Sequence, residues 1–268
     1  MKEDELYHRL DIGFLKTKRR VAEERNISEA VFDKPSLMAL YKLSKKGAFS
    51  ELKSIVSTGK ESSLFLGKKG KKDVAVKIFL QETTDFRNMT KYVAGDPRFG
   101  AWKNRRQLVQ MWAQKEFKNL SRVEKVIRCP KPIAVEGNVL VMSFLGDNGR
   151  PAPRLRDVRP KDPQRYFDET VGYMKRMYGE RLVHADLSEY NLLDYKGHPY
   201  IIDMATGVLL DHPSALEFLE RDAKNVVNYF KKQGVVADYD EVMKSIRTED
   251  SRGKVEYNSI MREIAHDL

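Results

Sequence analysis

The sequence predicts an α+β fold in two parts, with strands concentrated in the first half and helices in the second. Residues 51–80 have the short apolar runs and Lys/Gly turns of a β-meander, and one long stretch of helical periodicity follows over 107–123. Helical spacing dominates again after residue 163. This separation of strands from helices is typical of α+β proteins.

Composition limits the class of protein. Hydrophobic residues make up 41% of the 268 residues, which is enough to fill a core. Lys and Arg outnumber Asp and Glu by 49 to 39, giving a net charge of +10. This excess suggests an anionic partner such as a nucleotide or nucleic acid, with an ordinary basic surface as the alternative. Because Cys129 is the only cysteine, an intrachain disulfide and a cysteine-based zinc site are excluded.

The sequence shows no membrane segment. The N-terminus lacks an apolar core of signal-peptide length, and no window approaches the roughly 20 apolar residues that a membrane-spanning helix needs. We therefore expect a soluble, cytoplasmic protein without a membrane partner. The oligomeric state is not indicated by the sequence.

The first part is expected to consist of a helical N-terminal extension over 1–47 and a strand-rich domain over 48–143. The extension ends in a helix that starts near Pro35 and stops at Gly47, and its apolar residues share one face: Leu37, Leu40, Tyr41 and Leu43. In the strand-rich domain, residues 81–106 are polar and basic without helical or strand periodicity. We interpret them as a flexible loop.

The second part is expected over 144–268. A Pro- and Arg-rich connector leads into a helix over about 163–180. A later amphipathic helix begins near Ser214, which is spaced from Glu217 as in a capping box, and ends at Gly234.

Three polar residues, Asp186, Asn191 and Asp203, stand among apolar runs, where charged groups cost free energy unless something pairs with them. A hairpin turn centred on Lys196 and Gly197 would place Asn191 opposite residue 202, beside Asp203. Both would then supply oxygen ligands at the open end of one hairpin. Mg²⁺ typically takes one or two such protein oxygens together with phosphate and water, so the missing partner is most simply a magnesium nucleotide.

The spacing H-x-D-x-x-x-x-N, followed by an aspartate at a strand end, matches the catalytic loop and metal site of protein kinases. In that pattern Asp186 accepts the proton of the attacking hydroxyl, and Asn191 and Asp203 hold Mg²⁺ or Mn²⁺. The alternative is a structural hairpin with solvated polar ends.

The ATP site can be sought independently of this loop. The run VAVKIF matches the kinase strand whose lysine holds the α- and β-phosphates, which predicts that role for Lys77. Glu116 on the following helix is the candidate to pair with Lys77, and Glu124 is its rival.

Phosphate and adenine contacts are expected at two further places. The stretch STGKESSLF lies between the first two predicted strands and contains one glycine rather than a G-x-G-x-x-G motif. It offers hydroxyl, amine and backbone donors to phosphate from Ser57, Thr58, Gly59, Lys60 and Ser62, with a plain turn as the alternative. The hinge that would contact adenine contains Met142, Ser143 and Leu145.

Taken together, STGKESSLF, VAVKIF, LVHADLSEYNLL, IIDMATGV and LDHPSALEFLERD resemble the RIO family of atypical serine/threonine protein kinases over about residues 33–235. HADLSEYN resembles the type-one branch, and the compact chain is similar to archaeal members. The resemblance implies a bilobal protein-kinase-like fold, with a β-sheet and one long helix in the N-lobe and a mostly helical C-lobe without an activation loop.

The resemblance also implies ATP with Mg²⁺ or Mn²⁺, autophosphorylation, and a role in small ribosomal subunit maturation with ribosomal RNA and ribosomal proteins as partners. Candidate autophosphorylation sites are Thr83, Thr84, Thr90 and Ser121. Two residues depart from the pattern. Ser143 stands where a hinge Glu is common, and Met204 replaces the Phe of D-F-G, which questions conventional D-F-G switching.

Two other functions remain open at this point. One is a small-molecule phosphotransferase of the aminoglycoside-kinase type, which shares the same catalytic spacing. The other is a non-enzymatic RNA- or ribosome-binding scaffold, supported by the net charge and by the basic stretches 98–106 and 150–161. A metal-dependent phosphate-release assay distinguishes these functions.

Overall fold

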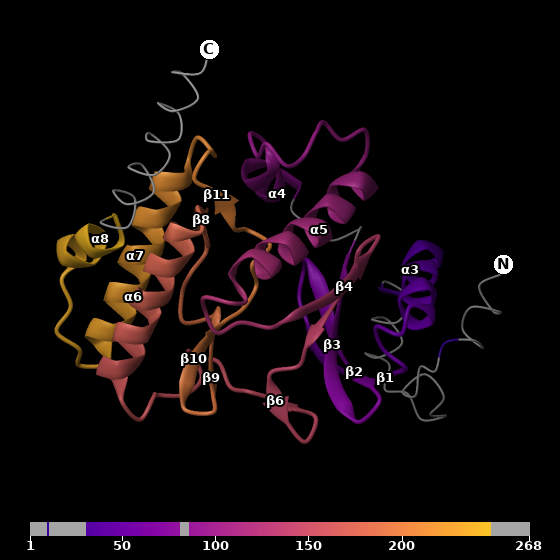
Figure 1. Ribbon diagram of the computed structural model, residues 1–268, viewed down its shortest axis with the longest axis horizontal. Coiled ribbons are helices and arrows are strands. Elements are labelled where there is room, and N and C mark those ends of the chain that lie inside the picture. Colours follow the sequence, from indigo (N-terminus) through magenta and orange to yellow (C-terminus); the bar gives the residue numbers. More distant parts are fainter. Residues whose placement is uncertain (1–9, 11–30, 81–85, 248–268) are drawn as a thin grey trace, which may run out of the picture. The chain divides into compact units, whose positions relative to one another are not determined.

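The computed structural model describes residue 10, residues 31–80 and residues 86–247, and Figure 1 traces their helices and strands. These residues form two compact units. The first comprises the chain up to Glu124 together with Pro130–Ala152 and Asp203–Ala205, and the second comprises Lys125–Cys129, Pro153–Ile202 and the chain from Thr206 onward. No helix among the described residues is long and apolar enough to cross a membrane.

The first unit is built on a five-stranded antiparallel sheet in the order β1-β2-β3-β5-β4. Its strands are β1 (Glu51–Thr58), β2 (Ser62–Lys69), β3 (Lys72–Phe79), β4 (Pro132–Glu136) and β5 (Val139–Ser143). The predicted meander is confirmed, and a tight turn joins β4 to β5. A short pair, β6 (Gly146–Asp147) and β7 (Arg150–Pro151), follows the sheet.

Helices cover the two faces of this sheet (Figure 1). Helix α3 (Lys34–Lys45) begins at the cap Asp33 and buries the apolar face predicted for it, together with Val74, Val76 and Ile78 of β3. Successive side chains of a strand point to opposite faces, so Lys77 points away from α3. The long helix α5 (Arg105–Val123) packs against β3, β4 and β5.

The absence of regular structure predicted over 81–106 was wrong for part of that range. Helix α4 spans Phe86–Val93, and α5 begins at Arg105 after the cap Asn104. Met89, Tyr92 and Val93 are buried at helical spacing, and the Tyr92 ring lies 5.9 Å from that of Trp112 on α5. The apolar face of α4 therefore has a partner that the local sequence does not reveal.

The second unit contains α6 (Pro163–Gly179), α7 (Ala215–Lys232) and α8 (Tyr239–Arg247), which pack against one another. Two small strand pairs complete it: β8 (Leu182–Val183) with β11 (Val208–Leu209), and the hairpin β9 (Leu192–Tyr195) with β10 (His198–Ile201). The expected capping box at α7 is not formed, because Ser214 makes no side-chain cap hydrogen bond. Gly234 has a φ of 92°, as expected of a residue that ends a helix.

Asn138 connects α3 to the sheet. Its amide nitrogen donates to Ser36 Oγ at 2.8 Å and to the Phe79 carbonyl at 2.8 Å, and the residue is buried. We predict that Asn138→Ala lowers the free energy of unfolding by about 1–3 kcal/mol, because both buried acceptors lose their donor. Denaturant titration measures this change.

Lys46→Ala is the matched control. It removes an exposed ion pair with Glu136 from the same junction between α3 and β4, and exposed pairs contribute about 0–1 kcal/mol. Equal losses of stability in the two variants would contradict the importance given to the buried amide.

Candidate active site

Lys77, Glu116 and Asp203 meet in the first unit. The Lys77 ammonium lies 2.7 Å from Glu116 Oε2 and 2.9 Å from Asp203 Oδ1. Sheet register places Lys77 in the middle of β3, opposite Leu140 on β5, and Glu116 lies on the buried side of α5. The structure thus pairs Lys77 with Glu116 as expected, and the rival Glu124 is only the C-cap residue of α5.

Burial and charge act in opposite directions on Lys77. Burial by itself lowers the pKa of the ammonium, but the charges of Asp203 and Glu116 outweigh this and raise the pKa above its usual value. Burial also raises the pKa of Glu116, and the charge of Lys77 opposes that rise. Lys77 is therefore a fixed positive charge, which suits a group that binds phosphate oxygens.

Asp203 differs from its two partners in exposure and in backbone conformation. Its side chain is 48% exposed, whereas that of Lys77 is 9% exposed and that of Glu116 is 1% exposed. Its φ of 60° lies in the left-handed region, which costs a residue with a Cβ atom about 1–2 kcal/mol. The chain thus holds Asp203 in an unfavourable conformation that leaves carboxylate oxygen accessible.

In the second unit, the loop that carries Asp186 is fixed by a buried carboxylate. Asp222 on α7 accepts hydrogen bonds from the backbone N–H groups of Ala185, at 2.7 Å, and Leu187, at 2.9 Å. Arg221 donates to the Ala185 carbonyl, and Asn225 donates to the Leu187 carbonyl at 3.2 Å. Asp186 itself is exposed. The backbone on both sides of Asp186 is held while its side chain stays accessible.

Asp222 was missed by the sequence analysis. It lies on the buried face of α7 beside Leu219 and Ala223, where an acidic residue in an apolar stripe is the one signal that could have revealed it. Burial raises the pKa of Asp222 to about 7, against the lowering effect of the two backbone donors. Because each of its oxygens accepts an N–H group, the geometry is that of a carboxylate.

The predicted hairpin register is confirmed. His198 pairs with Tyr195, and the Ile202 N–H donates to the Asn191 carbonyl at 3.0 Å, so Asn191 lies opposite residue 202. The Asn191 amide nitrogen donates to the Asp186 carbonyl at 2.9 Å and to its carboxylate at 3.3 Å. This orientation leaves the amide oxygen as the atom that could be a metal ligand.

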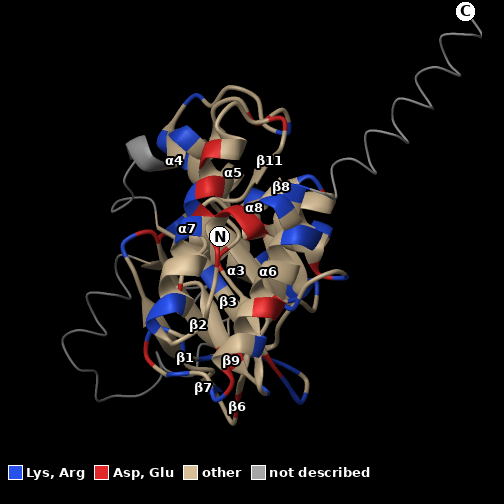
Figure 2. Cartoon of the chain, turned by 90° about the vertical axis from the view of Figure 1, so that its left-hand side faces the viewer, with Lys and Arg blue, Asp and Glu red and all other residues tan. Residues whose placement is uncertain are grey.

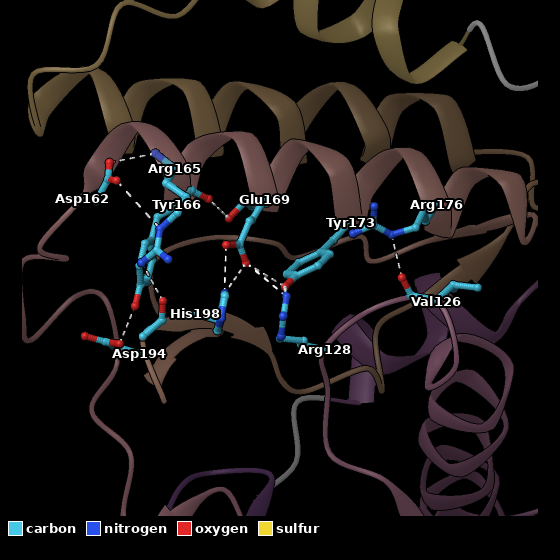
Figure 3. Close-up of polar contacts among 12 residues, drawn as sticks. Val126, Arg128, Asp162, Arg165, Tyr166, Glu169, Tyr173, Arg176, Asp194 and His198 are labelled. Carbon is cyan, nitrogen blue, oxygen red and sulfur yellow. Dashed lines mark hydrogen bonds and ion pairs between the residues drawn. The ribbon is translucent and has the colours of Figure 1, made fainter.

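Helix α6 holds the same hairpin through a row of polar contacts (Figure 3). The Tyr166 hydroxyl donates to Asp194 at 2.5 Å, and Arg165 donates to the Gly197 carbonyl at 2.8 Å. Glu169 lies 2.9 Å from His198 Nδ1 and also accepts from Arg128. The hairpin that begins beside Asn191 is thereby fixed along its length.

His184 has a structural role. Its Nδ1 faces the Asp186 N–H at 3.3 Å and its Nε2 faces the Ile202 carbonyl at 3.0 Å. This arrangement requires the tautomer in which Nε2 carries the hydrogen. The imidazole therefore connects the start of the loop that carries Asp186 to the end of the hairpin.

The residues predicted to contact ATP all lie in the first unit. Ser57 and Thr58 end β1, and the exposed turn that follows contains Gly59 and Lys60 and is closed by the Gly59 N–H donating to the Ser62 carbonyl at 2.9 Å. Met142 and Ser143 end β5, and Leu145 follows, with its carbonyl accepting from Ala152 at 3.0 Å. The Ser143 hydroxyl accepts from the Lys131 N–H at 2.9 Å. Their roles in nucleotide binding remain predictions.

The donor set fits a hard cation such as Mg²⁺. The described residues contain no cluster of three or more His, Cys, Asp or Glu side chains of the kind that forms a protein-only metal site. Asp203 in the first unit has a carboxylate oxygen and Asn191 in the second has an amide oxygen, and each is an atom of the kind that Mg²⁺ binds beside phosphate and water. Their role as metal ligands remains a prediction.

Comparison with known proteins identifies the family to which the chain belongs. A family model described as the RIO domain matches residues 63–242. The chain belongs to the RIO kinase family. It is a serine/threonine protein kinase.

Two archaeal relatives are named RIO-type serine/threonine-protein kinase Rio1, in agreement with the predicted type-one branch. The protein of Haloferax volcanii is 41% identical over 242 residues, covering 88% of this chain and 83% of the relative. That of Thermoplasma acidophilum is 44% identical over 186 residues, covering 69% of this chain and 98% of the relative.

The bilobal protein-kinase-like fold is also confirmed by a solved structure. The Rio2 kinase of Chaetomium thermophilum, as an ADP/Mg²⁺-phosphoaspartate complex, matches with a TM-score of 0.62 and 24% identity. The match covers 79% of this chain and 66% of that one.

Asp222→Asn tests how the loop that carries Asp186 is held. An amide offers one acceptor oxygen, so one of the two backbone N–H groups loses its partner. We expect the free energy of unfolding to fall by about 1–3 kcal/mol. A misplacement of Asp186 of similar energetic size lowers turnover about tenfold or more. Chemical denaturation and ATP turnover measure the two effects.

Asp211→Asn is the control, because Asp211 pairs with Arg181 and both side chains are 55% exposed. Neutralising it should change stability and turnover little. Wild-type turnover in Asp222→Asn would show that the loop does not depend on this carboxylate.

Proposed function

We propose that this RIO kinase transfers the γ-phosphoryl group of ATP, bound with Mg²⁺ or Mn²⁺, and that it acts in maturation of the small ribosomal subunit. The observation that carries the catalytic part is the buried Lys77 ammonium, held at 2.7 Å from Glu116 and 2.9 Å from Asp203. A fixed cation beside an exposed carboxylate is the arrangement that phosphoryl transfer requires for phosphate and metal. The ribosomal part is supported by the family alone.

Each candidate residue has a separate task in this proposal. Lys77 holds the α- and β-phosphates, and Asp203 with Asn191 holds the metal, which would neutralise charge on the phosphates when bound. Asp186 orients the acceptor and takes its proton. Backbone and hydroxyl donors of the turn after β1 cover the phosphates, and the segment from Met142 to Leu145 contacts adenine.

The acceptor is not an extended peptide in this proposal. The chain between Asp203 and Ser214 is short, and residues 206–210 are hydrogen-bonded to residues 181–184. Thr206 donates to the His184 carbonyl at 2.9 Å, Leu210 donates to the Arg181 carbonyl at 3.0 Å, and β11 pairs with β8. Protein kinases that dock peptides use a longer segment ending in A-P-E at this place. We infer that the acceptor is the chain itself, water or a folded particle.

Two kinds of self-phosphorylation can be distinguished. The first uses hydroxyl groups: Ser121 is exposed on α5 and Thr90 lies on α4, whereas Thr83 and Thr84 lie outside the described residues. The second uses an aspartate, suggested by the phosphoaspartate of the Chaetomium Rio2 complex. In that case an aspartate oxygen bonds to the γ-phosphorus, ADP leaves, and water later hydrolyses the acyl phosphate.

Ribosomal RNA is the proposed anionic partner, and the cytoplasm is the corresponding location. Lys103, Arg105 and Arg106 are exposed, and we propose that they contact phosphate. Arg98 is largely buried against Asp96, so it does not belong with these three residues. Lys and Arg occur in most of the elements visible in Figure 2, with Asp and Glu among them, so net charge alone does not define one binding surface.

Asp203→Ala and Asp186→Asn separate metal binding from transfer. We expect Asp203→Ala to abolish metal-dependent ATP turnover, because the metal loses its anionic ligand. Asp186→Asn should retain nucleotide binding but lose phosphoryl transfer, because only the positioning of the acceptor is lost. Phosphate release and fluorescent-nucleotide binding give the two readouts. Wild-type turnover by Asp203→Ala would refute the metal assignment.

ATP turnover in the presence of acceptors tests the substrate. Small-subunit precursor particles should stimulate turnover, and an unstructured Ser/Thr peptide library should not. Hydroxylamine releases phosphate from an acyl phosphate but leaves Ser and Thr phosphates intact, so treating the labelled protein identifies the kind of acceptor. Efficient, sequence-selective peptide phosphorylation without a response to particles would overturn this proposal.

A further inference from the structure

Helix α5 binds the backbone immediately after Asp203 with three buried side chains. Glu116 accepts the Met204 N–H, and the Asn119 amide nitrogen donates to the Met204 carbonyl at 2.7 Å. Lys115 Nζ donates to the Ala205 carbonyl at 3.1 Å. Because Glu116 also binds Lys77, one helix controls both the phosphate lysine and the chain that carries the metal aspartate.

The orientation of the Asn119 amide is set from both ends. Arg98 Nη1 donates to its oxygen at 2.6 Å, while its nitrogen faces the Met204 carbonyl. If the amide were flipped, two donors would meet at Arg98 and two acceptors at Met204. Only one orientation satisfies both neighbours, so Arg98 determines which atom of Asn119 faces the metal-aspartate segment.

Arg98 is itself fixed by Asp96. The guanidinium donates to both carboxylate oxygens, from Nε at 2.9 Å and from Nη2 at 2.7 Å, and the Arg98 N–H donates to the same carboxylate at 3.0 Å. Asp96 is 2% exposed. A fork-to-fork pair of this kind has little freedom to rotate. The order of contacts is Asp96, Arg98, Asn119 and then the Met204 carbonyl, and all of them lie in the first unit.

Asp203 needs such support because its backbone is left-handed. Met204, the next residue, is fully buried, and both its N–H and its carbonyl are bound by α5. Release of the Met204 carbonyl would free the peptide between Met204 and Ala205. Met204 would then be held only through its N–H, and the backbone of Asp203 before it could shift and move the carboxylate.

We propose that Arg98 and Asn119 are positioning residues for Asp203, which fix the Met204 carbonyl and so hold the metal-binding carboxylate in place. The inference rests on the proposed role of Asp203 as a metal ligand. It gives the segment Gly95–Phe99, which follows α4, control over metal binding. It also gives Arg98, the first residue of the basic stretch 98–106, a role inside the first unit. It also ties residues 203–205 to α5, so they cannot leave independently of that helix.

The test measures the Mg²⁺ concentration for half-maximal ATP turnover, at saturating ATP, in the full-length protein. Arg98→Ala and Asn119→Ala should each raise this concentration about five- to tenfold, the scale of one hydrogen bond to a charged or buried partner. Turnover at saturating Mg²⁺ should fall less than the apparent metal affinity. Gln114→Ala, an exposed substitution on the same helix, should leave both quantities unchanged.

The double variant makes the test specific. Because Arg98 acts through Asn119, the Arg98→Ala/Asn119→Ala protein should need little more Mg²⁺ than either single variant, whereas independent effects would multiply. Arg98→Lys keeps the charge but not the planar fork, so it should restore only part of the metal affinity.

Asp203→Ala in the same assay distinguishes a failure of the proposed metal-binding function of Asp203 from a failure of the positioning inference. If Asp203→Ala keeps metal-dependent turnover, the proposed function of Asp203 fails. If Asp203→Ala loses turnover but Arg98→Ala and Asn119→Ala have wild-type Mg²⁺ dependence, the positioning inference alone is wrong. A lowered melting temperature with unchanged Mg²⁺ dependence, or multiplicative effects in the double variant, would also overturn it.

Discussion

A buried ammonium group must be paired, and this requirement organises the first unit around Lys77. The central strand β3 carries Lys77 to a position from which water is largely excluded, so two carboxylates have to approach it. Glu116 brings α5 against the sheet, and Asp203 brings in a segment distant in sequence. The Lys77 ammonium also makes a cation–π contact with Phe79, whose ring centroid lies 4.9 Å away. Long-range packing in this unit therefore follows from the location of one charge.

The second unit solves the related problem of fixing a loop whose functional side chain must remain exposed. A buried carboxylate, Asp222, binds two backbone N–H groups there, so the positions of Ala185 and Leu187 are set without any contact to the carboxylate of Asp186. Each unit thus buries an acidic residue, Glu116 in the first and Asp222 in the second, whose carboxylate is hydrogen-bonded. Buried polar groups of this kind are stabilising only while every partner is present, which makes the geometry all-or-none.

Local patterns predicted the five-stranded sheet, the hairpin β9/β10 and the helices α3, α5, α6 and α7, but not α4, α8 or the short strand pairs. The register at Lys196 and Gly197 was predictable because the position and length of a hairpin turn fix which residues pair. The role of Asp222 was not predictable. Its partners are backbone N–H groups, and the sequence does not show which N–H groups a side chain will bind. Helix α4 was missed because its three buried residues form too short a period within a polar stretch. The capping box predicted at Ser214 does not form because Ser214 has a ψ of 14°, whereas a capping residue needs an extended backbone.

The amide of Asn119 also bears on the chemical ageing of the enzyme. Asparagine deamidates when the backbone nitrogen of the next residue attacks the side-chain carbonyl, and the product, aspartate, would place an acceptor against the Met204 carbonyl. Asn119 lies inside α5, where the following peptide nitrogen is held by helical hydrogen bonding, and its side chain is fully buried. The same packing that defines its orientation therefore also slows its chemical decay.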